Sequence, residues 1–190
     1  MLLWAVVAAL TTSTRFYGQS LLRDARVPLT AIGLAGMLGN LAAIVPTTLA
    51  ARVERRFGTY PPLYAGSALV PVSILLAGLV PRTGFVALAV LVALILASDI
   101  LSEGLYPLFS KAVNALTPSD RRATVLSSGS MLFSLVMMVL FPPIGLCSDK
   151  VGVAAGFALA GGGALLLGGV FVIWRLGRIA RRREGAARNE

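Results

Sequence analysis

Three ionisable side chains, Arg15, Asp99 and Glu103, stand inside stretches of the chain that are otherwise apolar. Asp99 and Glu103 are four residues apart, so on a helix they share one face. A charge at bilayer depth costs several kcal/mol unless it faces water or a partner of opposite charge. A hydrated carboxylate in such a place could bind and release a proton, and an arginine could pair with it.

The depth of these residues follows from the helical rise of roughly 1.5 Å per residue. Asp99 lies about 15 Å from the helix end expected near Phe109, close to mid-membrane, and Arg15 lies about 10 Å from the outer end of its own segment. A static charge pair that only fixes helix packing is the alternative interpretation. The residues predicted to line a substrate or proton pathway are Asp99, Glu103, Arg15, Gln19, Tyr17 and Asn40.

Six long apolar segments would carry these residues. Hydrophobic residues make up 57% of the 190, charged residues only 13%, and the mean hydropathy is +0.84. Stretches such as 86–97 and 152–172 lack the polar face that a soluble helix needs. We therefore predict an all-α integral membrane protein with six transmembrane helices, each near the roughly 20 residues that span a bilayer. The expected helices are 1–22, 28–51, 60–80, 84–109, 122–146 and 151–175.

The basic residues are distributed unevenly between the two sides of such a bundle. Twelve of the seventeen lie around the turn between segments two and three, around the turn between segments four and five, and in the tail 176–190 with the adjacent Arg175. The other five lie on the opposite side or within segment one. The positive-inside rule then places both termini in the cytoplasm of a multi-pass cell-membrane protein. We interpret the basic tail as a topology anchor, with an anionic-lipid site as the alternative. No nucleic-acid partner is expected, because aromatic residues are not interleaved with the tail's arginines.

Several kinds of chemistry are disfavoured by composition. Cys147 is the single cysteine and the chain has no histidine, which argues against redox pairs, zinc sites and histidine-dependent triads. We expect no metal, no cofactor and no enzymatic activity. An intramembrane enzyme is the third-ranked alternative.

Two charged turns closed by glycine suggest an internal repeat. One runs from Arg52 to Gly58 after segment two, and the other from Ser148 to Gly152 after segment five. They lie on opposite sides of the membrane, as in a 3+3 inverted repeat. The apolar run also begins directly at Met1 without a basic flank, which suggests a start inside something larger, with a signal peptide as the alternative.

Small residues and prolines mark the helix contacts. Gly152, Gly156, Ala160, Ala164 and Gly168 form a ladder at four-residue spacing, and Gly33, Gly36 and Gly39 form a shorter one. Both ladders predict close helix packing. Pro46, Pro71, Pro107, Pro142 and Pro143 are expected to kink or end their helices.

Three stretches resemble the C-terminal half of a major facilitator superfamily transporter of the drug-efflux-like kind. Residues 15–19 followed by Val27-Pro28 are similar to the end of that superfamily's seventh helix, 51–58 to its turn between helices eight and nine, and 114–124 to the entry of helix eleven. The resemblance implies half of a twelve-helix bundle whose first and fourth segments line the central cavity. It also implies a gating turn formed by Arg52, Glu54, Arg55, Arg56 and Gly58.

The resulting functional prediction is a permease half, a secondary active transporter that couples efflux of a small molecule to protons. Its expected partners are the lipid bilayer, the small-molecule substrate, and either a missing N-terminal six-helix half or a second copy in a homodimer, because the pathway forms between two halves. The alternative is a non-transporting small membrane protein that acts as an assembly factor or subunit.

Overall fold

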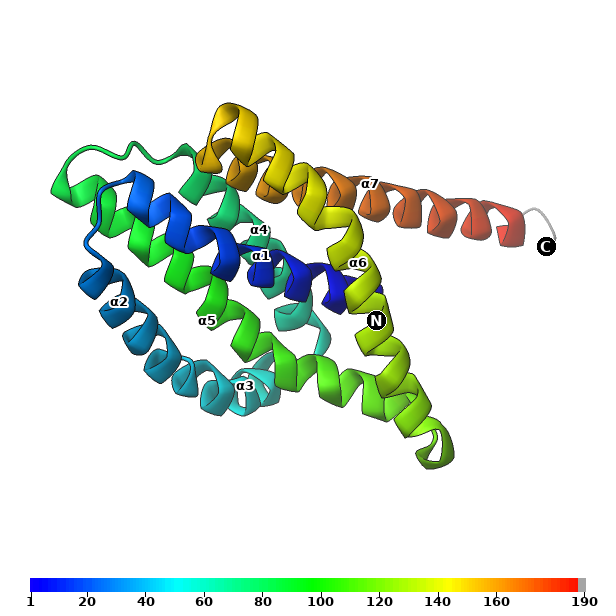
Figure 1. Ribbon diagram of the computed structural model, residues 1–190. Helices are drawn as coiled ribbons and strands as arrows, with labels where there is room; N and C mark the ends of the chain where they lie inside the picture. Colours follow the sequence, from blue (N-terminus) through cyan, green and yellow to red (C-terminus); the bar gives the residue numbers. More distant parts are fainter. Residues whose placement is uncertain (188–190) are drawn as a thin grey trace.

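The computed structural model describes the backbone of residues 1–187 and the side-chain surroundings of residues 1–170. Within these residues the chain forms a helical bundle without strands (Figure 1). The helices are α1 (Leu2–Asp24), α2 (Leu29–Ala42), α3 (Ile44–Phe57), α4 (Tyr60–Leu79), α5 (Phe85–Leu116), α6 (Arg122–Val151) and α7 (Val153–Ala187), and a short 3-10 turn, η1 (Ser119–Arg121), precedes α6.

Five stretches of the described residues are long and apolar enough to cross a bilayer. They are α2 together with α3, α4, α5, η1 together with α6, and α7 as far as Val170. This confirms the predicted all-helical fold class and is consistent with a multi-pass membrane protein. The first predicted span, α1, has sufficient length but is less apolar than these five, because threonine, serine, arginine and glutamine fill its second half.

The polar residues of α1 are compatible with its position inside the bundle. Thr11, Thr12, Ser13 and Thr14 each donate a hydrogen bond of 2.8–3.0 Å to the carbonyl four residues earlier. Their hydroxyl groups are thus satisfied within the helix and can be buried without an unpaired donor. The helix contacts α2, α4, α5, α6 and α7.

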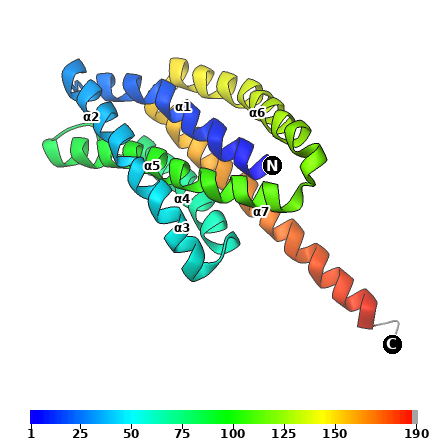
Figure 2. The same cartoon turned by 90° about the horizontal axis from the view of Figure 1, so that it is seen from below.

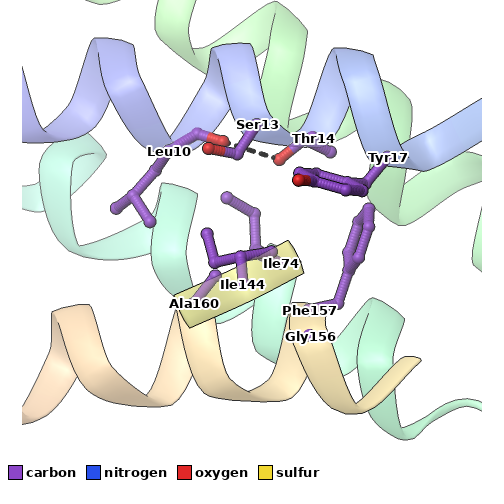
Figure 3. A pocket seen from close by; sticks show the side chains of 9 residues that line it. All are labelled: Leu10, Ser13, Thr14, Tyr17, Ile74, Ile144, Gly156, Phe157 and Ala160. Carbon is purple, nitrogen blue, oxygen red and sulfur yellow. Dashed lines mark hydrogen bonds between the residues drawn. The ribbon is translucent and has the colours of Figure 1, made fainter. Parts of the chain in front are cut away.

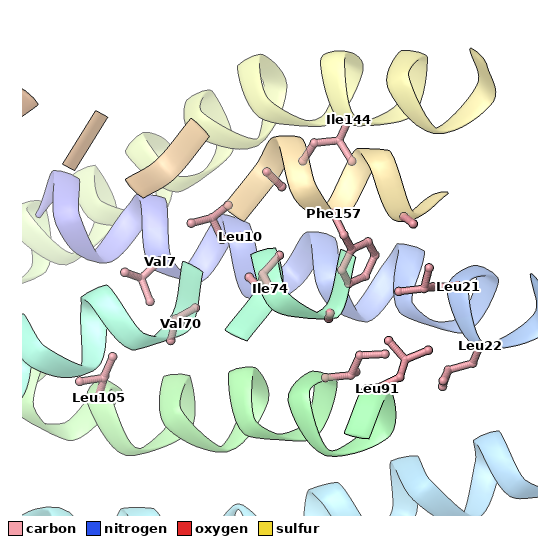
Figure 4. Packing of buried hydrophobic residues seen from close by; sticks show 14 of the residues in the cluster. Val7, Leu10, Leu21, Leu22, Val70, Ile74, Leu91, Leu105, Ile144 and Phe157 are labelled. Carbon is pink, nitrogen blue, oxygen red and sulfur yellow. The ribbon is translucent and has the colours of Figure 1, made fainter. Parts of the chain in front are cut away.

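The hydrophobic core forms around α1 (Figure 4). Leu10 and Leu21 of α1, Ile74 of α4 and Leu91 of α5 are almost completely buried. Phe157 of α7 and Ile144 of α6 extend the same cluster. The core therefore joins the helices that must hold α1 and α5 in a fixed relationship.

The second predicted segment, 28–51, is not a single helix. The structure divides it at Ala43 into α2 and α3, and α3 continues to Phe57. Pro46 has no N–H with which to reach the carbonyl of Ala42, and its ring crowds that carbonyl, so the helix breaks there. The break lies directly beside Asn40 and the cavity described below.

Other helices end later than the predicted boundaries. α5 continues to Leu116, α6 to Val151 and α7 to Ala187, because backbone hydrogen bonding continues after the apolar run ends. The predicted tail 176–190 is thus continuous with α7 as far as Ala187, and its side chains lie outside the described surroundings. Figures 1 and 2 place the N-terminus, the α3–α4 turn and the α5–α6 turn at one end of the bundle, with the α1–α2, α4–α5 and α6–α7 turns at the other.

The two charged turns end their helices in the same way. Gly58 has φ +79° and donates its N–H to Glu54 O at 2.7 Å, and Gly152 has φ +111° and donates to Ser148 O at 2.9 Å. Residues that have a side chain rarely adopt such positive φ angles, which explains the glycine at both positions.

Close helix packing occurs mainly between α4 and α7. A Cβ atom on Gly78 would lie 2.6 Å from Ala158 N, and one on Gly161 would lie 2.6 Å from Pro71 O. The predicted small-residue ladder is only partly used, because Gly168 faces open space and Gly152 lies before α7 begins. In the shorter ladder only Gly39 meets a neighbour, the side chain of Leu96, while Gly33 and Gly36 meet none.

Candidate functional site

Arg15 of α1 bridges two carboxylates of α5. Its Nε lies 3.3 Å from Asp99 Oδ1, and its Nη2 lies 2.8 Å from Glu103 Oε1. The carboxylates are one turn apart on the face of α5 that meets α1, so a single forked guanidinium reaches both. We call these three residues the Arg15 cluster. The structure thus brings together the three ionisable residues that the sequence identified within the spans.

The two ion pairs of the cluster are unequal. The bond to Glu103 has the length typical of a strong charge-assisted hydrogen bond, whereas the bond to Asp99 is longer. The Arg15 side chain is 49% exposed, Glu103 is 41% exposed and Asp99 is 21% exposed. Asp99 is therefore the more enclosed carboxylate and the one held more loosely by Arg15.

A cavity of about 250 Å³ lies beside the cluster, between α1, α2 and α5. Small residues of α2 and of its junction with α3 leave this space, because Ala35, Gly36, Gly39 and Ala43 project little or no side chain into it. We call it the α1–α2–α5 cavity. The other lining residues are Thr14, Arg15, Gly18, Gln19, Leu22, Ile32, Asn40, Val92, Ile95, Leu96 and Asp99.

Four of the predicted pathway residues meet at this cavity. Arg15 and Gln19 come from α1, Asn40 from α2 and Asp99 from α5. The Asn40 side chain is held by a 3.0 Å hydrogen bond from its Nδ2 to Gly36 O, one turn earlier. Glu103 lies one turn beyond Asp99 and joins the site through Arg15 rather than as a lining residue.

Tyr17, the remaining predicted pathway residue, lies elsewhere. Its ring packs against Phe141 of α6, with centroids 5.7 Å apart. It lines a separate apolar cavity of about 10 Å³ between α1, α4, α6 and α7 (Figure 3). That volume is near the lower limit for a single water molecule, so this second cavity cannot hold a substrate. Tyr17 is two positions after Arg15 on the same helix, which turns the two side chains toward different helices.

The predicted gating turn is held to α5 by Glu54. Glu54 Oε1 accepts a hydrogen bond from Lys111 Nζ at 2.8 Å and another from Thr59 Oγ1 at 2.6 Å. Glu54 belongs to the last turn of α3, Thr59 precedes α4, and Lys111 lies near the end of α5. One carboxylate therefore connects three helices at the end of the bundle that holds the N-terminus.

The arginines of this turn make local contacts. Arg55 Nε donates to Ala51 O at 3.2 Å, and the Arg56 guanidinium lies 5.5 Å from the ring centroid of Phe57. Arg52 is exposed. Gly58 ends α3, as described above. None of these contacts reaches the α1–α2–α5 cavity, so the turn and the cavity are separate parts of the structure.

Some site residues were not identified from the sequence. By sequence, Lys111 belongs to the basic residues around the turn between segments four and five, which indicate topology and not a pairing with Glu54. Gly36 and Gly39 are predicted to be packing residues, whereas both line the cavity. The signal that could have identified them is the neighbouring Asn40, an amide within an apolar helix.

No protein-family model matches the chain, and no curated protein and no solved structure matches it.

Proposed function

We propose that this chain is one six-helix half of a secondary transporter of the major facilitator type, in which Asp99 carries the coupling proton and a small molecule moves through the α1–α2–α5 cavity. The observation that supports it best is the meeting of Arg15 and Asp99 at one cavity from two different helices. Ionisable groups inside membrane bundles mark ion and substrate pathways by default.

The ion-pair geometry favours Asp99 over Glu103 as the proton carrier. Glu103 forms the shorter bond to Arg15, and Asp99 is the carboxylate that lines the cavity. A proton on Asp99 would leave the Arg15–Glu103 pair intact and electrically neutral. Release of that proton would restore the negative charge in the cavity, so one group can alternate without dismantling the cluster.

A second six-helix unit is part of the proposal. About half of the Arg15 side chain and two fifths of the Glu103 side chain are exposed, and both lie in the middle of helices flanked by apolar surface. Hydrocarbon cannot solvate these charges, so protein or trapped water must cover them. A distinct N-terminal half or a second copy of the chain, facing α1, α2 and α5, would provide that cover.

We also propose that the bundle is a 3+3 inverted repeat with a defined orientation in the membrane. The matching glycine ends at Gly58 and Gly152 support a 3+3 inverted repeat. The end of the bundle that holds the N-terminus also holds the turn at Arg52, Arg55 and Arg56, and the positive-inside rule assigns that end to the cytoplasm. The cell membrane is the proposed location.

One observation favours a competing function, a non-transporting subunit that uses the bundle as a docking surface. Both carboxylates already contact Arg15, as expected of a static cluster that fixes the position of α1 against α5. The two functions differ in whether Asp99 faces water. In a transporter, water must reach Asp99 from each side of the membrane in turn. In a packing cluster, water reaches Asp99 from neither side.

Cysteine accessibility tests the proposal. In a Cys147→Ser background, Asp99→Cys is labelled with a membrane-impermeant maleimide in right-side-out and inside-out vesicles. We expect labelling from both sides. Ser98→Cys is the matched control, because Ser98 is fully buried one residue away and should not react. Equal protection of positions 98 and 99 would favour the docking function.

A further inference from the structure

The Arg15 cluster carries one negative charge more than its contacts neutralise. Two carboxylates, Asp99 and Glu103, face a single guanidinium. Among the described residues, the other ion pairs join Lys111 to Glu54 and Arg121 to Asp120, outside the cavity. An uncompensated charge at this depth is expensive, so the cavity favours a positive charge, either the coupling proton on Asp99 or, while Asp99 is deprotonated, a cation beside it.

The excess charge is directed into the cavity. Glu103 forms the tighter bond to Arg15 and does not line the cavity, whereas Asp99 forms the longer bond and does. A cation in the cavity would therefore meet Asp99 first. The Arg15–Glu103 pair behind it would remain in place.

The remaining walls determine what kind of cation fits. Leu22, Ile32, Val92, Ile95 and Leu96 supply apolar surface around Asp99, and Thr14, Gln19 and Asn40 supply the polar part of the lining. A bare metal ion could use only the few oxygens of these polar side chains and gains nothing from the apolar surface. An organic cation uses both features, because its charged group contacts Asp99 and its hydrocarbon part contacts the apolar walls.

The volume limits the size of the part of the ligand that this chain encloses, because Gln19, Gly36 and Asn40 in the lining are exposed and leave the cavity open on one side. A cavity of about 250 Å³ is smaller than the roughly 300–1,000 Å³ that is typical of sites for drug-sized molecules. A primary amine with a single ring or a short hydrocarbon chain is the appropriate scale. An anion is disfavoured, because Arg15 is already engaged by two carboxylates and the cluster as a whole is negative.

We infer that the α1–α2–α5 cavity binds a small organic monocation, with its charged group at Asp99 and its apolar body against α2 and α5. The inference rests on the proposed transport function and names the substrate class for that site. It concerns ligand charge and size, so it can fail while the transport proposal stands.

Three probes that share one ring and differ in charge test the inference. They are phenethylammonium, the neutral 2-phenylethanol and the anionic 3-phenylpropionate. Binding of each radiolabelled probe to the purified 190-residue chain is measured by equilibrium dialysis in a maltoside detergent, which has no ammonium group of its own. We expect saturable binding of phenethylammonium that is at least about tenfold tighter than that of the other two.

Variants then show whether the excess charge is responsible. Asp99→Asn and Glu103→Gln each remove it, and both should weaken phenethylammonium binding by about tenfold to a hundredfold. Arg15→Gln removes the positive charge beside Asp99 and should tighten binding. Asp149→Asn is the control, because it removes an exposed carboxylate from the last turn of α6, away from the cavity, and should change nothing. Circular dichroism and size-exclusion chromatography show which variants are folded.

Three results would each overturn the inference. They are binding of 2-phenylethanol as tight as that of phenethylammonium, loss of phenethylammonium binding in a folded Arg15→Gln variant, and no saturable binding of phenethylammonium. If Asp99→Asn does not fold, Glu103→Gln answers the same question. A further combination of results is labelling of Asp99→Cys from both sides of the membrane while the three probes bind equally well. That combination would support the transport proposal and contradict the inference that the ligand is a monocation.

Discussion

Lys111 Nζ lies 2.8 Å from Glu54 Oε1, and this ion pair joins the end of α3 to α5 two turns beyond Glu103. The Lys111 side chain is 64% exposed and Glu54 is 16% exposed. Because α5 carries this pair as well as Asp99, one helix runs from the α3–α4 turn to the cavity, with Pro107 between the two sites.

We predict that the Glu54–Lys111 pair contributes only modestly to stability. Since Lys111 is mostly exposed, a double-mutant cycle of Glu54→Gln and Lys111→Gln should give a coupling of about 0.2–1 kcal/mol. Thermal unfolding in detergent measures it, and high salt should reduce it. Lys150→Gln, at the opposite end of the bundle, should show no coupling to Glu54→Gln. A coupling that does not respond to salt would contradict a partly exposed ion pair.

Gly161 should tolerate no large side chain. A Cβ at this position meets Leu75 N and Pro71 O, both backbone atoms of α4, and backbone cannot yield as a flexible side chain can. Gly161→Leu should destabilise the bundle by about 1–3 kcal/mol or more. Gly163→Leu is the matched control, because nothing lies within 4 Å of a Cβ there. Equal melting temperatures for the two variants would contradict the α4–α7 contact.

Removal of Arg15 should destabilise the protein more than removal of either carboxylate. Arg15→Gln leaves Asp99 and Glu103 facing each other without a cation, at an expected cost of about 1–3 kcal/mol after allowing for partial exposure. Adding Glu103→Gln to this variant should recover part of that loss. Thermal unfolding of the single and double variants provides the measurement. Additive losses in the double variant would mean that the three groups do not act together.

The orientation of the bundle can be tested with reporters. A fluorescent protein that matures only in the cytoplasm should be active when fused after Glu190, because the positive-inside rule places that end in the cytoplasm. A phosphatase that is active only outside the cytoplasm should report activity when inserted in the α4–α5 turn at Arg82. The opposite pattern would reject the proposed orientation.

Asp99→Asn should abolish pH-driven accumulation or extrusion in the assembled transporter while leaving the fold intact. Asparagine has nearly the same shape as aspartate but cannot carry the proton. Uphill flux of phenethylammonium in vesicles with an imposed pH gradient tests this prediction, with Asp149→Asn as the control. Uphill movement with unchanged pH dependence in Asp99→Asn would show that Asp99 is not the proton carrier.

Much of the fold was predictable because the bilayer imposes simple constraints. Apolar length identified the helices from residue 60 to the start of α7, since each span must satisfy its own backbone hydrogen bonds. The division of the second segment at Ala43 was harder to predict from the sequence. Pro46 signalled a disturbance, but a proline can kink a helix or end it, and packing against neighbouring helices determines which occurs.

The candidate site, like the fold, could be predicted from the sequence only in part. The sequence alone identified Arg15, Asp99 and Glu103, because charges within apolar segments are rare and costly whatever the fold. It also placed Asp99 and Glu103 on one face, since helical periodicity is a local property. Only the tertiary structure decided that Arg15 bridges them, that Tyr17 faces α6 instead, and that glycines of α2 leave a cavity beside Asp99. Those relationships depend on how α1 is rotated between its neighbours, and that rotation is set by the packing of many side chains together rather than by any one segment.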